Sequence, residues 1–364
     1  MTATICLVCC VIYFLWIVTI IYGWHRLSPL KQGKNGSDIS IIIPFRNEAE
    51  NLPALISSLD KQENLHGQME LIFVNDHSDD DGDKIIKTKH SHRIIHLSIA
   101  YGKKEAIAAG IKASQYPWII TLDADVTVGN KWASTIQRAI VTADSDMLIL
   151  PVLIENDFTL TSRFQSVEFM GITGITAGST SIGMPLMCNG ANLAFLREAW
   201  FQSNQRRNDH NISSGDDMFL LEAIKKKGKV SWVHEQAAIA STKGAGGLFP
   251  LLSQRIRWAS KGLKFRDGVI LTSGILVASI NLMIPIMFVL TITKLLTWGT
   301  FLICLLLKIL PETYLSMVVM RWMNKKTLIT YLPFFTLIHP FYVIVVLAAS
   351  IIMKPRWKGR KILQ

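Results

Sequence analysis

The chain has 364 residues, of which 50% are hydrophobic and 18% charged, and its mean hydropathy is +0.31. This composition excludes a disordered chain and argues against a purely soluble one. The net charge of +11 is compatible with nucleic acid, an anionic membrane surface or an anionic substrate as partner, so the position of the excess charge has to decide.

Ten basic residues lie in two short clusters beside hydrophobic segments: Arg255, Arg257, Lys261, Lys264 and Arg266, then Lys354, Arg356, Lys358, Arg360 and Lys361. Clusters in this position are typical of anchors to anionic lipid head groups, and nucleic acid is the weaker interpretation. Of the five cysteines, only Cys188 lies outside a hydrophobic run. The sequence therefore offers no disulfide framework and no cysteine zinc site.

The first hydrophobic segment, residues 5–22, carries no charge and is close to the ~20 residues that cross a bilayer. A secretory signal peptide is the alternative, but no Lys or Arg precedes the run and no small-x-small cleavage site follows it, so we expect an anchor. Near the C-terminus, residues 269–293 and 327–353 are long enough to span. Residues 295–307 form a shorter run that continues into an interrupted stretch at 308–322. We expect three or four membrane passes, the third of these being unsettled.

Residues 39–248 alternate strand and helix patterns. Strands are expected at 39–43, ended by Pro44, at 70–74 and at 118–122, and helices at 52–59, 103–113 and 218–225. This order predicts an α/β fold with a mostly parallel sheet covered by helices on both faces. Ligands of such sheets bind beyond the carboxyl ends of the strands, where polar residues deserve most weight.

Positive charge predicts the orientation in the membrane. His25, Arg26, Lys31 and Lys34 follow the first segment, and the cluster from Arg255 precedes the next, so both edges of the α/β region should face the cytoplasm. Three later crossings would then place the basic tail outside, against the same rule. Either residues 295–322 lie in the interface or cross twice, or the rule fails here.

The most informative short motif is Asp123-Ala124-Asp125, directly after the strand at 118–122. Two carboxylates at this spacing can hold a hard divalent cation that also contacts a diphosphate. A solvated turn is the plain alternative, but the position after a buried strand favours the metal site.

The other strand ends also carry polar residues, Arg46-Asn47-Glu48 after the first and Asn75-Asp76 after the second. Asp76 suits a nucleotide base or ribose, whereas the run from Asp79 to Gly82 is expected to be a polar turn and helix start. Gly102-Lys103 opens a helix, so that Lys103 either faces phosphate or belongs to a solvated basic turn.

Three further segments have both a structural and a functional interpretation. In Ser214-Gly215-Asp216-Asp217, one carboxylate can cap the following helix and the other can act as general base on an acceptor hydroxyl. Gly190-Ala191-Asn192 is either a loop close to a ligand or a strand turn. The segment Gln254-Arg255-Ile256-Arg257-Trp258 is amphipathic; it anchors to lipid, or also offers an Arg to a diphosphate and a Trp face to a sugar.

In this order, the motifs resemble those of a membrane-anchored family 2 glycosyltransferase of GT-A fold, with a D-x-D and a Q-x-x-R-W element, in the superfamily of cellulose and hyaluronan synthases. The resemblance covers residues 40–261, with a weak match at Trp357-Lys358-Gly359-Arg360. It implies an α/β Rossmann-like nucleotide-diphospho-sugar transferase domain with N-terminal and C-terminal transmembrane helices.

The resemblance also implies residue roles. Asp217 would be the catalytic base, with Asp216 beside it; Asp125 would bind Mg or Mn; Asn192, Gln254, Arg257 and Trp258 would lie at the acceptor and diphosphate end. The donor and its nucleotide would contact Pro44, Arg46, Glu48, Asp76, Lys103 and Asp123. The sequence has Gly-Asp-Asp where processive synthases have Thr-Glu-Asp, so the choice of Asp217 over Asp216 is itself a hypothesis.

The expected division of the chain is an anchor at 1–24, a cytoplasmic GT-A domain at 25–248, an amphipathic interfacial helix at 249–267, a transmembrane region at 268–353 and a basic tail at 354–364. The expected reaction is inverting transfer from a nucleotide sugar, UDP-linked rather than GDP-linked, to a lipid or lipid-linked glycan at the cytoplasmic face of the inner membrane.

Three alternatives remain. A processive polysaccharide synthase shares the motifs but needs a channel, for which three or four helices are few. A non-catalytic membrane scaffold is disfavoured by the set of acidic residues and Arg257. A transporter is disfavoured because none of the expected hydrophobic cores holds an acidic residue.

Overall fold

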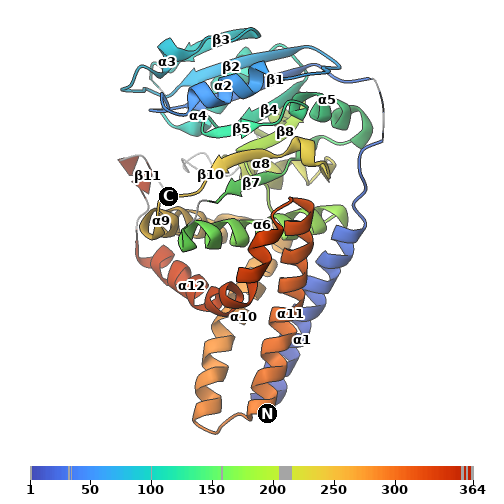
Figure 1. Cartoon of the computed structure of the whole chain (residues 1–364), viewed down its shortest axis with the longest axis vertical. Coiled ribbons are helices and arrows are strands. Elements are labelled where there is room, and N and C mark those ends of the chain that lie inside the picture. The colour runs from blue at the N-terminus through green and yellow to red at the C-terminus, as the bar shows by residue number, and fades with distance from the viewer. Residues whose placement is uncertain are drawn as a thin grey trace. The chain divides into compact units, whose positions relative to one another are not determined.

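The computed structural model describes residues 2–31, 33, 35–99, 101–156, 159–204, 215–353, 356–357 and 360–361. The chain forms two compact units, each assembled from segments that are distant in sequence (Figure 1). We call them the α/β unit (Ser28–Glu155 and Met187–Lys243) and the helical unit (Met1–Leu27, Asn156–Leu186 and Gly244–Ile362).

The α/β unit is built on a seven-stranded sheet with the strand order β3-β2-β1-β4-β8-β6-β9. The strands are β1 (Ile39–Phe45), β2 (Met69–Asn75), β3 (Ser91–His96), β4 (Trp118–Leu122), β6 (Met147–Ile149), β8 (Asn192–Leu196) and β9 (Val230–Trp232). The first four in this order run parallel, β8 is antiparallel to β4 and β6, and β9 is parallel to β6. The expected mostly parallel sheet is confirmed, and β8 is its one reversed strand among those described.

A second sheet of three short strands was not expected. It has the order β5-β10-β7, with β5 (Val126–Val128), β10 (Ala240–Lys243) and β7 (Val152–Glu155). β10 is antiparallel to β5 and parallel to β7. Because β5 begins directly after Asp125, this small sheet holds the far side of the D-x-D segment.

The helices of the α/β unit are α2 (Leu52–Asp60), α3 (Gly82–Ile85), α4 (Lys103–Ala113), α5 (Trp132–Ala143), α7 (Arg197–Asn204) and α8 (Asp216–Ile224), with a 3₁₀ turn η1 (Gln236–Ala238). On one face of the large sheet, α4, α7 and α8 share a core cluster that includes Ile42, Ile72, Ile107, Trp200 and Leu221. The helical spacing of apolar residues in α4 thus buries one side of it against β1 and β2. This packing fixes the beginning of α4, where Lys103 lies.

Pro44 does not end the first strand, contrary to expectation. β1 continues through Pro44 to Phe45, and Pro44 stands opposite Val74 of β2. On its other side β1 pairs with β4 only from Ile39 to Ile42, so that pairing loses no hydrogen bond to the missing N–H of Pro44.

The helical unit contains α1 (Thr2–His25), α6 (Leu160–Ser181), α9 (Leu248–Ala259), α10 (Gly268–Ile292), α11 (Trp298–Trp322) and α12 (Leu332–Ile352). Shorter elements are the 3₁₀ turns η2 (Gly262–Lys264) and η3 (Lys326–Tyr331) and a hairpin of β11 (Arg356–Trp357) and β12 (Arg360–Lys361). Most of the expected tail 354–364 lies outside the described residues. Among the residues that the structure describes, four segments are long and apolar enough to cross a membrane: Thr2–His25, Gly268–Ile292, Trp298–Trp322 and Lys326–Ile352.

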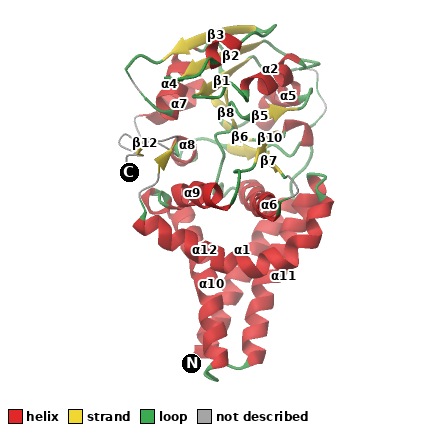
Figure 2. Ribbon diagram, turned by 60° about the vertical axis from the view of Figure 1, so that its left-hand side comes forward, coloured by secondary structure: helices red, strands yellow, loops and turns green. Residues whose placement is uncertain are grey.

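The third of these segments settles one open point. Residues 298–322 form one continuous helix, α11, so the short run at 295–307 and the interrupted stretch after it are a single element that does not cross twice. Figures 1 and 2 show α1, α10 and α11 running alongside one another, with α6 and α12 lying across them.

Helix α6 departs from the expected division of the chain, because it falls within the predicted domain 25–248 but belongs to the helical unit. It meets α1 where two glycines face each other: a Cβ on Gly178 would lie 2.3 Å from the backbone oxygen of Ile20, and a Cβ on Gly23 would lie 2.1 Å from that of Gly178. Only glycine permits so close a contact between two helix backbones.

Charged residues lie inside α11, which corrects the argument used against a transporter. Lys308 is fully buried, and its Nζ donates to both oxygens of Glu312, at 2.9 and 2.7 Å. The hydroxyl of Tyr13 in α1 also donates to Glu312. An acidic residue is therefore present in a candidate span, but it is paired with a cation and a hydroxyl rather than left open to an ion path.

Candidate active site

The carboxyl ends of β1 and β2 lie level with each other, since Phe45 pairs with Asn75. The backbone N–H of Asp76 donates to the carbonyl oxygen of Phe45 at 2.9 Å, so Asp76 leaves the sheet beside the end of β1. Asp123 follows β4, the other neighbour of β1, and its backbone N–H donates to the carbonyl oxygen of Ala191 at 3.4 Å. The expected gathering of polar residues at this edge is therefore present.

Asp76 is almost fully buried, with 2% of its surface exposed. Its Oδ1 accepts from the backbone N–H of Gly102 at 3.0 Å and lies 3.3 Å from Nδ1 of His77. The ring of His77 in turn stacks on Tyr101 at 4.0 Å. The carboxylate thereby joins the end of β2 to the residue that precedes α4, and it fixes where α4 begins.

Lys103, the first residue of α4, forms an ion pair with Asp123, Nζ to Oδ1 at 2.6 Å. Burial alone would lower the pKa of this lysine, but the carboxylates of Asp123, Asp216 and Asp217 outweigh it and raise the pKa above its ordinary value. The ammonium is therefore held charged among three carboxylates that come from β4 and α8.

Asp125 is the outer carboxylate of the D-x-D segment, and Thr242 of β10 donates to its Oδ2 at 3.4 Å. The residue as a whole is exposed, yet burial of its carboxyl among its neighbours, followed by the negative charges of Asp123 and Glu48, raises its pKa to about 6. Crowded carboxylates of this kind are relieved by a cation.

Asp123 and Asp125 therefore suit Mg or Mn, which prefer oxygen ligands. Within the described ranges, no three acidic, histidine or cysteine side chains converge into a complete ion cage. An ion held by one or two carboxylates, with waters and substrate phosphates completing its shell, matches the usual magnesium arrangement.

Asp216 and Asp217 are the first two residues of α8, and the N-cap is Gly215, at a positive φ of 86°. Neither carboxylate is the N-cap residue, but Oδ1 of Asp217 accepts from the backbone N–H of Met218 at 2.9 Å, so one carboxylate oxygen does satisfy an N–H of the first turn. The other oxygen, Oδ2, accepts from the backbone N–H of Gly190 at 2.9 Å, and a Cβ on Gly190 would lie 3.3 Å from the Cβ of Asp217. The loop before β8 is thus a close-approach loop, and the side chain that it approaches is Asp217.

Cys188 lies beside the same carboxylate, and its Sγ donates to the carbonyl oxygen of Asp217 at 3.2 Å. Burial, with the charges of Asp217 and Asp216, raises the pKa of this thiol well above its usual range. A thiol kept protonated is a poor nucleophile, so Cys188 supports the loop rather than reacting.

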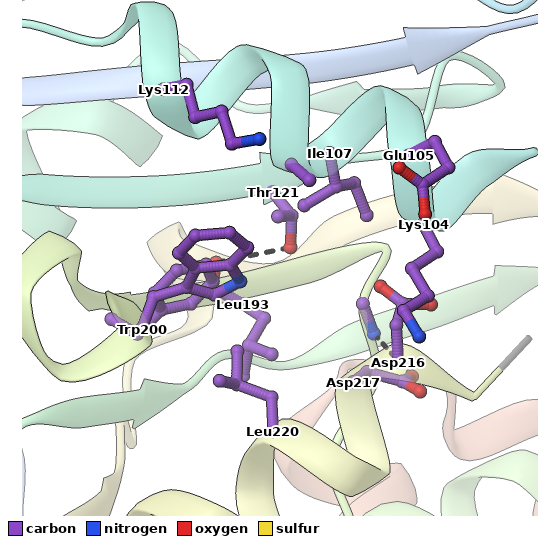
Figure 3. A pocket seen from close by; sticks show the side chains of 13 residues that line it. Lys104, Glu105, Ile107, Lys112, Thr121, Leu193, Trp200, Asp216, Asp217 and Leu220 are labelled. Carbon is purple, nitrogen blue, oxygen red and sulfur yellow. Dashed lines mark hydrogen bonds between the residues drawn. The ribbon is translucent and has the colours of Figure 1, made fainter. Parts of the chain in front are cut away.

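A cavity of about 210 Å³ opens beside these carboxylates (Figure 3). Asp216 and Asp217 of α8 and Lys104 and Glu105 of α4 line one part of it, and Trp200 and Lys112 line another. The walls between them come from α4, β4, β8 and α8. The cavity therefore lies next to the carboxylate that the sequence analysis marks as a general base.

Three other residues that were predicted to contact the donor nucleotide sugar lie on the first strand and the loop after it. Pro44 is buried within β1; the guanidinium of Arg46 is 3.9 Å from the carboxylate of Asp79; and Glu48 accepts from Nδ2 of Asn51 at 2.7 Å. The run from Asp79 to Gly82 is the expected polar turn, since Asp80 accepts from the backbone of Ala49 at 2.8 Å and of Gly82 at 3.2 Å.

Asn192 has a different position from the one expected. It is fully buried at the start of β8, and its Nδ2 donates to the carbonyl oxygens of Pro151 and Ala238, at 2.8 and 2.9 Å. Its Oδ1 accepts from the indole N–H of Trp132 at 3.3 Å. Because its amide is committed to the scaffold, we assign Asn192 no contact with acceptor or diphosphate.

Gln254, Arg257 and Trp258 lie on α9, within the helical unit. Their neighbour Arg255 is buried and pairs with Glu168 of α6, Nη2 to Oε2 at 2.8 Å, and its guanidinium lies 4.2 Å from the centroid of the Trp258 ring. Lys261 is buried as well. Arg255 and Lys261 therefore do not belong among the head-group anchors, contrary to expectation.

Residues 40–202 match the family described as Glycosyl transferase family 2. The chain carries a family 2 glycosyltransferase domain. The matched region contains Asp76, Lys103, Asp123 and Asp125 and ends before Asp216, so the two carboxylates of α8 lie outside it.

Relatives of this chain include a poly-beta-1,6-N-acetyl-D-glucosamine synthase of Staphylococcus epidermidis, 26% identical over 272 residues, which are 68% of this chain and 62% of that protein. An undecaprenyl-phosphate 4-deoxy-4-formamido-L-arabinose transferase of Proteus mirabilis is 38% identical over 95 residues, 24% of this chain and 29% of the relative. The chain thus spans at most about three fifths of the length of these two relatives.

The fold of the α/β unit is that of the GT-A class. A mannosyltransferase of Pyrobaculum calidifontis, solved in complex with GDP-Man and Mn2+, has a TM-score of 0.54 over 96% of this chain and 99% of its own, at 14% identity. The fold class expected from the motif order is confirmed, and at this identity the likeness extends to the fold alone.

Three contacts of the candidate site were not foreseen from the sequence. They are the ion pair of Lys103 with Asp123, the bond from Gly190 to Asp217 and the contact of Thr242 with Asp125, which join residues up to 117 positions apart. No local pattern carries that information, although the position of each candidate at an element end does.

Proposed function

We propose that this chain transfers a sugar from a nucleoside-diphosphate sugar to an acceptor hydroxyl, with inversion at the anomeric carbon. The observation that carries the proposal is the cluster around Lys103, where one ammonium pairs with Asp123 and feels the charges of Asp216 and Asp217. That cluster gathers in one place the groups for a diphosphate, a cation and a proton.

In the proposed reaction, Asp76 contacts the nucleotide base and Lys103 the diphosphate. Asp217 accepts the proton of the acceptor hydroxyl as its oxygen attacks the anomeric carbon and the nucleoside diphosphate leaves. The bond from Gly190 holds one carboxylate oxygen of Asp217 in place, which orients the base before the acceptor arrives. Asp123 and Asp125 would hold Mg or Mn, which would stabilise the charge that develops on the departing diphosphate.

We keep the sequence-based prediction of a UDP-linked rather than a GDP-linked donor, which the donor panel below tests, and we infer a lipid or lipid-linked acceptor. The acceptor inference rests on α9, which carries Gln254, Arg257 and Trp258 in an amphipathic helix of the same unit as the candidate spans. The relative that acts on an undecaprenyl phosphate supports the same acceptor class. The site residues of α9 would then meet the acceptor at the membrane surface.

A processive polysaccharide synthase is the second candidate, favoured by the synthase relative that matches 68% of this chain. The two functions differ in the product, since a transferase adds one sugar to a lipid and a synthase makes a long polymer. A non-catalytic scaffold remains the third, and it would bind nucleotide sugar without turnover.

We also infer that α1, α10 and α11 cross the inner membrane and that α12 lies in the interface. Basic residues stand at the C-terminal end of α1, before α10 and at the C-terminal end of α11, namely His25, Arg26, Lys264, Arg266, Arg321, Lys325 and Lys326. Three crossings put all these ends, the α/β unit and the basic tail in the cytoplasm, in accord with the positive-inside rule. Protection of a C-terminal tag from added protease in inside-out vesicles would contradict this topology.

The test of the function uses the full chain in detergent with a panel of UDP- and GDP-sugars and a lipid extract, with Mn2+, with Mg2+ and with chelator. We expect metal-dependent release of UDP from one donor and a lipid product one sugar heavier by mass spectrometry. A polymer product would favour the synthase, and binding of a nucleotide sugar without release of any nucleoside diphosphate would favour the scaffold.

A further inference from the structure

Asp123 has two roles that compete for the same carboxylate. In the structure, its Oδ1 holds the ammonium of Lys103 at 2.6 Å. In the proposed reaction, the same carboxylate holds Mg or Mn together with Asp125, while Lys103 contacts the diphosphate. An ammonium and a divalent cation on one carboxylate would repel each other at very short range. The two arrangements therefore belong to two different states of the site.

Lys103 supplies positive charge to both carboxylates of the D-x-D segment. Besides its ion pair with Asp123, its charge acts on Asp125, where it opposes the negative charges of Asp123 and Glu48. A metal ion at the same place would find an incomplete set of ligands, since within the described ranges no three ligand side chains converge. Its remaining positions would be left to waters and phosphate oxygens. Without a nucleotide, the ammonium is therefore a strong competitor for these carboxylates.

The side chain of Lys103 can leave Asp123 while its backbone stays in place. The start of α4 is fixed by the backbone N–H of Gly102, which donates to Oδ1 of Asp76 at 3.0 Å. The side chains of Lys103 and Asp123 each keep 29% of their surface exposed, so the ion pair is not enclosed. A lysine ammonium is a point charge on a flexible four-carbon stem. A diphosphate, which carries more negative charge than one carboxylate, can therefore draw it away.

From this competition we propose that Lys103 keeps the metal site closed until the nucleoside diphosphate binds. The diphosphate takes the ammonium from Asp123, and the freed carboxylate becomes available to the ion together with Asp125. The proposal rests on the proposed function and adds an order of binding, in which the ion alone binds weakly and the nucleotide opens its site. Such coupling is reciprocal, so Mn2+ strengthens UDP binding by the same factor as UDP strengthens Mn2+ binding.

The experiment measures binding to the full chain in detergent, with free Mn2+ followed by electron paramagnetic resonance and UDP by calorimetry. The decisive variant is Lys103→Met, which removes the ammonium and keeps an unbranched side chain. Lys103→Arg keeps the charge. Lys104→Met is the matched control, because it removes a charge from the next residue, whose side chain lies beside Asp216 on the cavity (Figure 3).

We expect UDP to tighten Mn2+ binding to the wild type by at least about 10-fold, within the ~5–150-fold that coupled sites commonly show. Lys103→Met should bind Mn2+ alone more tightly than the wild type by a similar factor, because no ammonium competes for Asp123. The same variant should bind UDP without metal more weakly, because the diphosphate loses a cation. Lys103→Arg should keep the weak binding of Mn2+ alone, and Lys104→Met should change it far less than Lys103→Met.

Equal Mn2+ affinity of the wild type with and without UDP would overturn the inference, and this comparison needs no variant to fold. Unchanged Mn2+ affinity in Lys103→Met would overturn it as well, since the ion would then use carboxylates that Lys103 does not occupy. Equal tightening in Lys103→Met and Lys104→Met would replace competition for Asp123 by general charge attraction. In these three cases UDP binding remains and the proposed function stands. Failure of the wild type to bind UDP would overturn the proposed donor together with this inference.

Discussion

The two units use polar residues in opposite ways. In the α/β unit, Asp123, Asp125 and Asp217 come from separate element ends and keep part of their surface exposed at one edge. In the helical unit, Lys308 with Glu312 and Arg255 with Glu168 are closed pairs whose charges are satisfied inside the protein. A substitution in the first group should therefore change chemistry, and a substitution in the second should change stability.

The largest effect is expected at Asp217. Asp217→Asn keeps the shape and, with its amide oxygen, the bond from Gly190, but it loses the bond from Met218 and cannot accept a proton, so the transfer rate should fall by about 10²–10⁴-fold, the usual contribution of a general base. The measurement is product formation at saturating donor, with donor binding and the thermal midpoint unchanged. Asp216→Asn is the matched control, and a larger loss there than at Asp217 would reverse the assignment of the base.

The opposite behaviour is expected at Lys308. Lys308→Met leaves Glu312 buried without its cation, which should destabilise the helical unit by about 3–5 kcal/mol, as in other broken buried pairs. The measurement is the denaturation midpoint in detergent. The same change at the exposed Lys294 should have little effect.

A triple variant sharpens this test. Lys308→Met, Glu312→Leu and Tyr13→Phe together remove the whole polar group, and the apolar replacement should recover most of the lost stability. If the triple variant is stable but inactive in sugar transfer, the cluster has a functional role and the contrast between the two units breaks down.

An intermediate effect is expected where α1 meets α6. Gly178→Ala puts a methyl group 2.3 Å from the backbone oxygen of Ile20, a clash that requires the two helices to separate and should cost about 1–3 kcal/mol. Gly171→Ala on the same helix is the matched control, because its Cβ would meet only Ser316 Oγ, at 3.6 Å. Equal thermal midpoints for the two variants would mean that the close contact is not needed for stability.

Local sequence patterns predict best the helices and strands whose apolar residues recur with the period of the element and are buried in the core. α4 and β4 have the predicted bounds, and β1 and β2 differ by one or two residues. The strands of the small sheet have only three or four residues each, too few for alternation to be distinguished from chance. The placement of α6 depends on Gly23 and Gly178, which are 155 positions apart, and hydropathy alone carries no sign of that contact.

The candidate site divides along the same line. Its residues could be named because they stand at strand ends and helix starts, where parallel sheets bind ligands. Their pairing could not be predicted, because Lys103 meets Asp123, and Gly190 meets Asp217, only through tertiary packing. Lys308 and Glu312 interrupt a hydrophobic run, and their acceptance inside α11 depends on Tyr13, 299 positions away.

The smallest effect is expected from His234, a residue of the α/β unit whose ring is partly buried. Burial lowers its pKa to about 4, against about 6.5 for an exposed histidine. As the pH falls below about 6.5 the unfolded chain takes up a proton that the folded chain does not, so stability is lost between about pH 6.5 and 4 and is unaffected above that window. His234→Gln should be free of this loss, about 1–2 kcal/mol once partial exposure is allowed for.

The measurement is the difference between wild-type and variant midpoints across pH 4–8, with His92→Gln, an exposed position, as control. A constant difference across the range would show that His234 also carries its proton in the folded chain. In that case this titratable group of the α/β unit would be as closely paired as the charges of the helical unit, and the contrast between the units would hold only for the carboxylates of the candidate site.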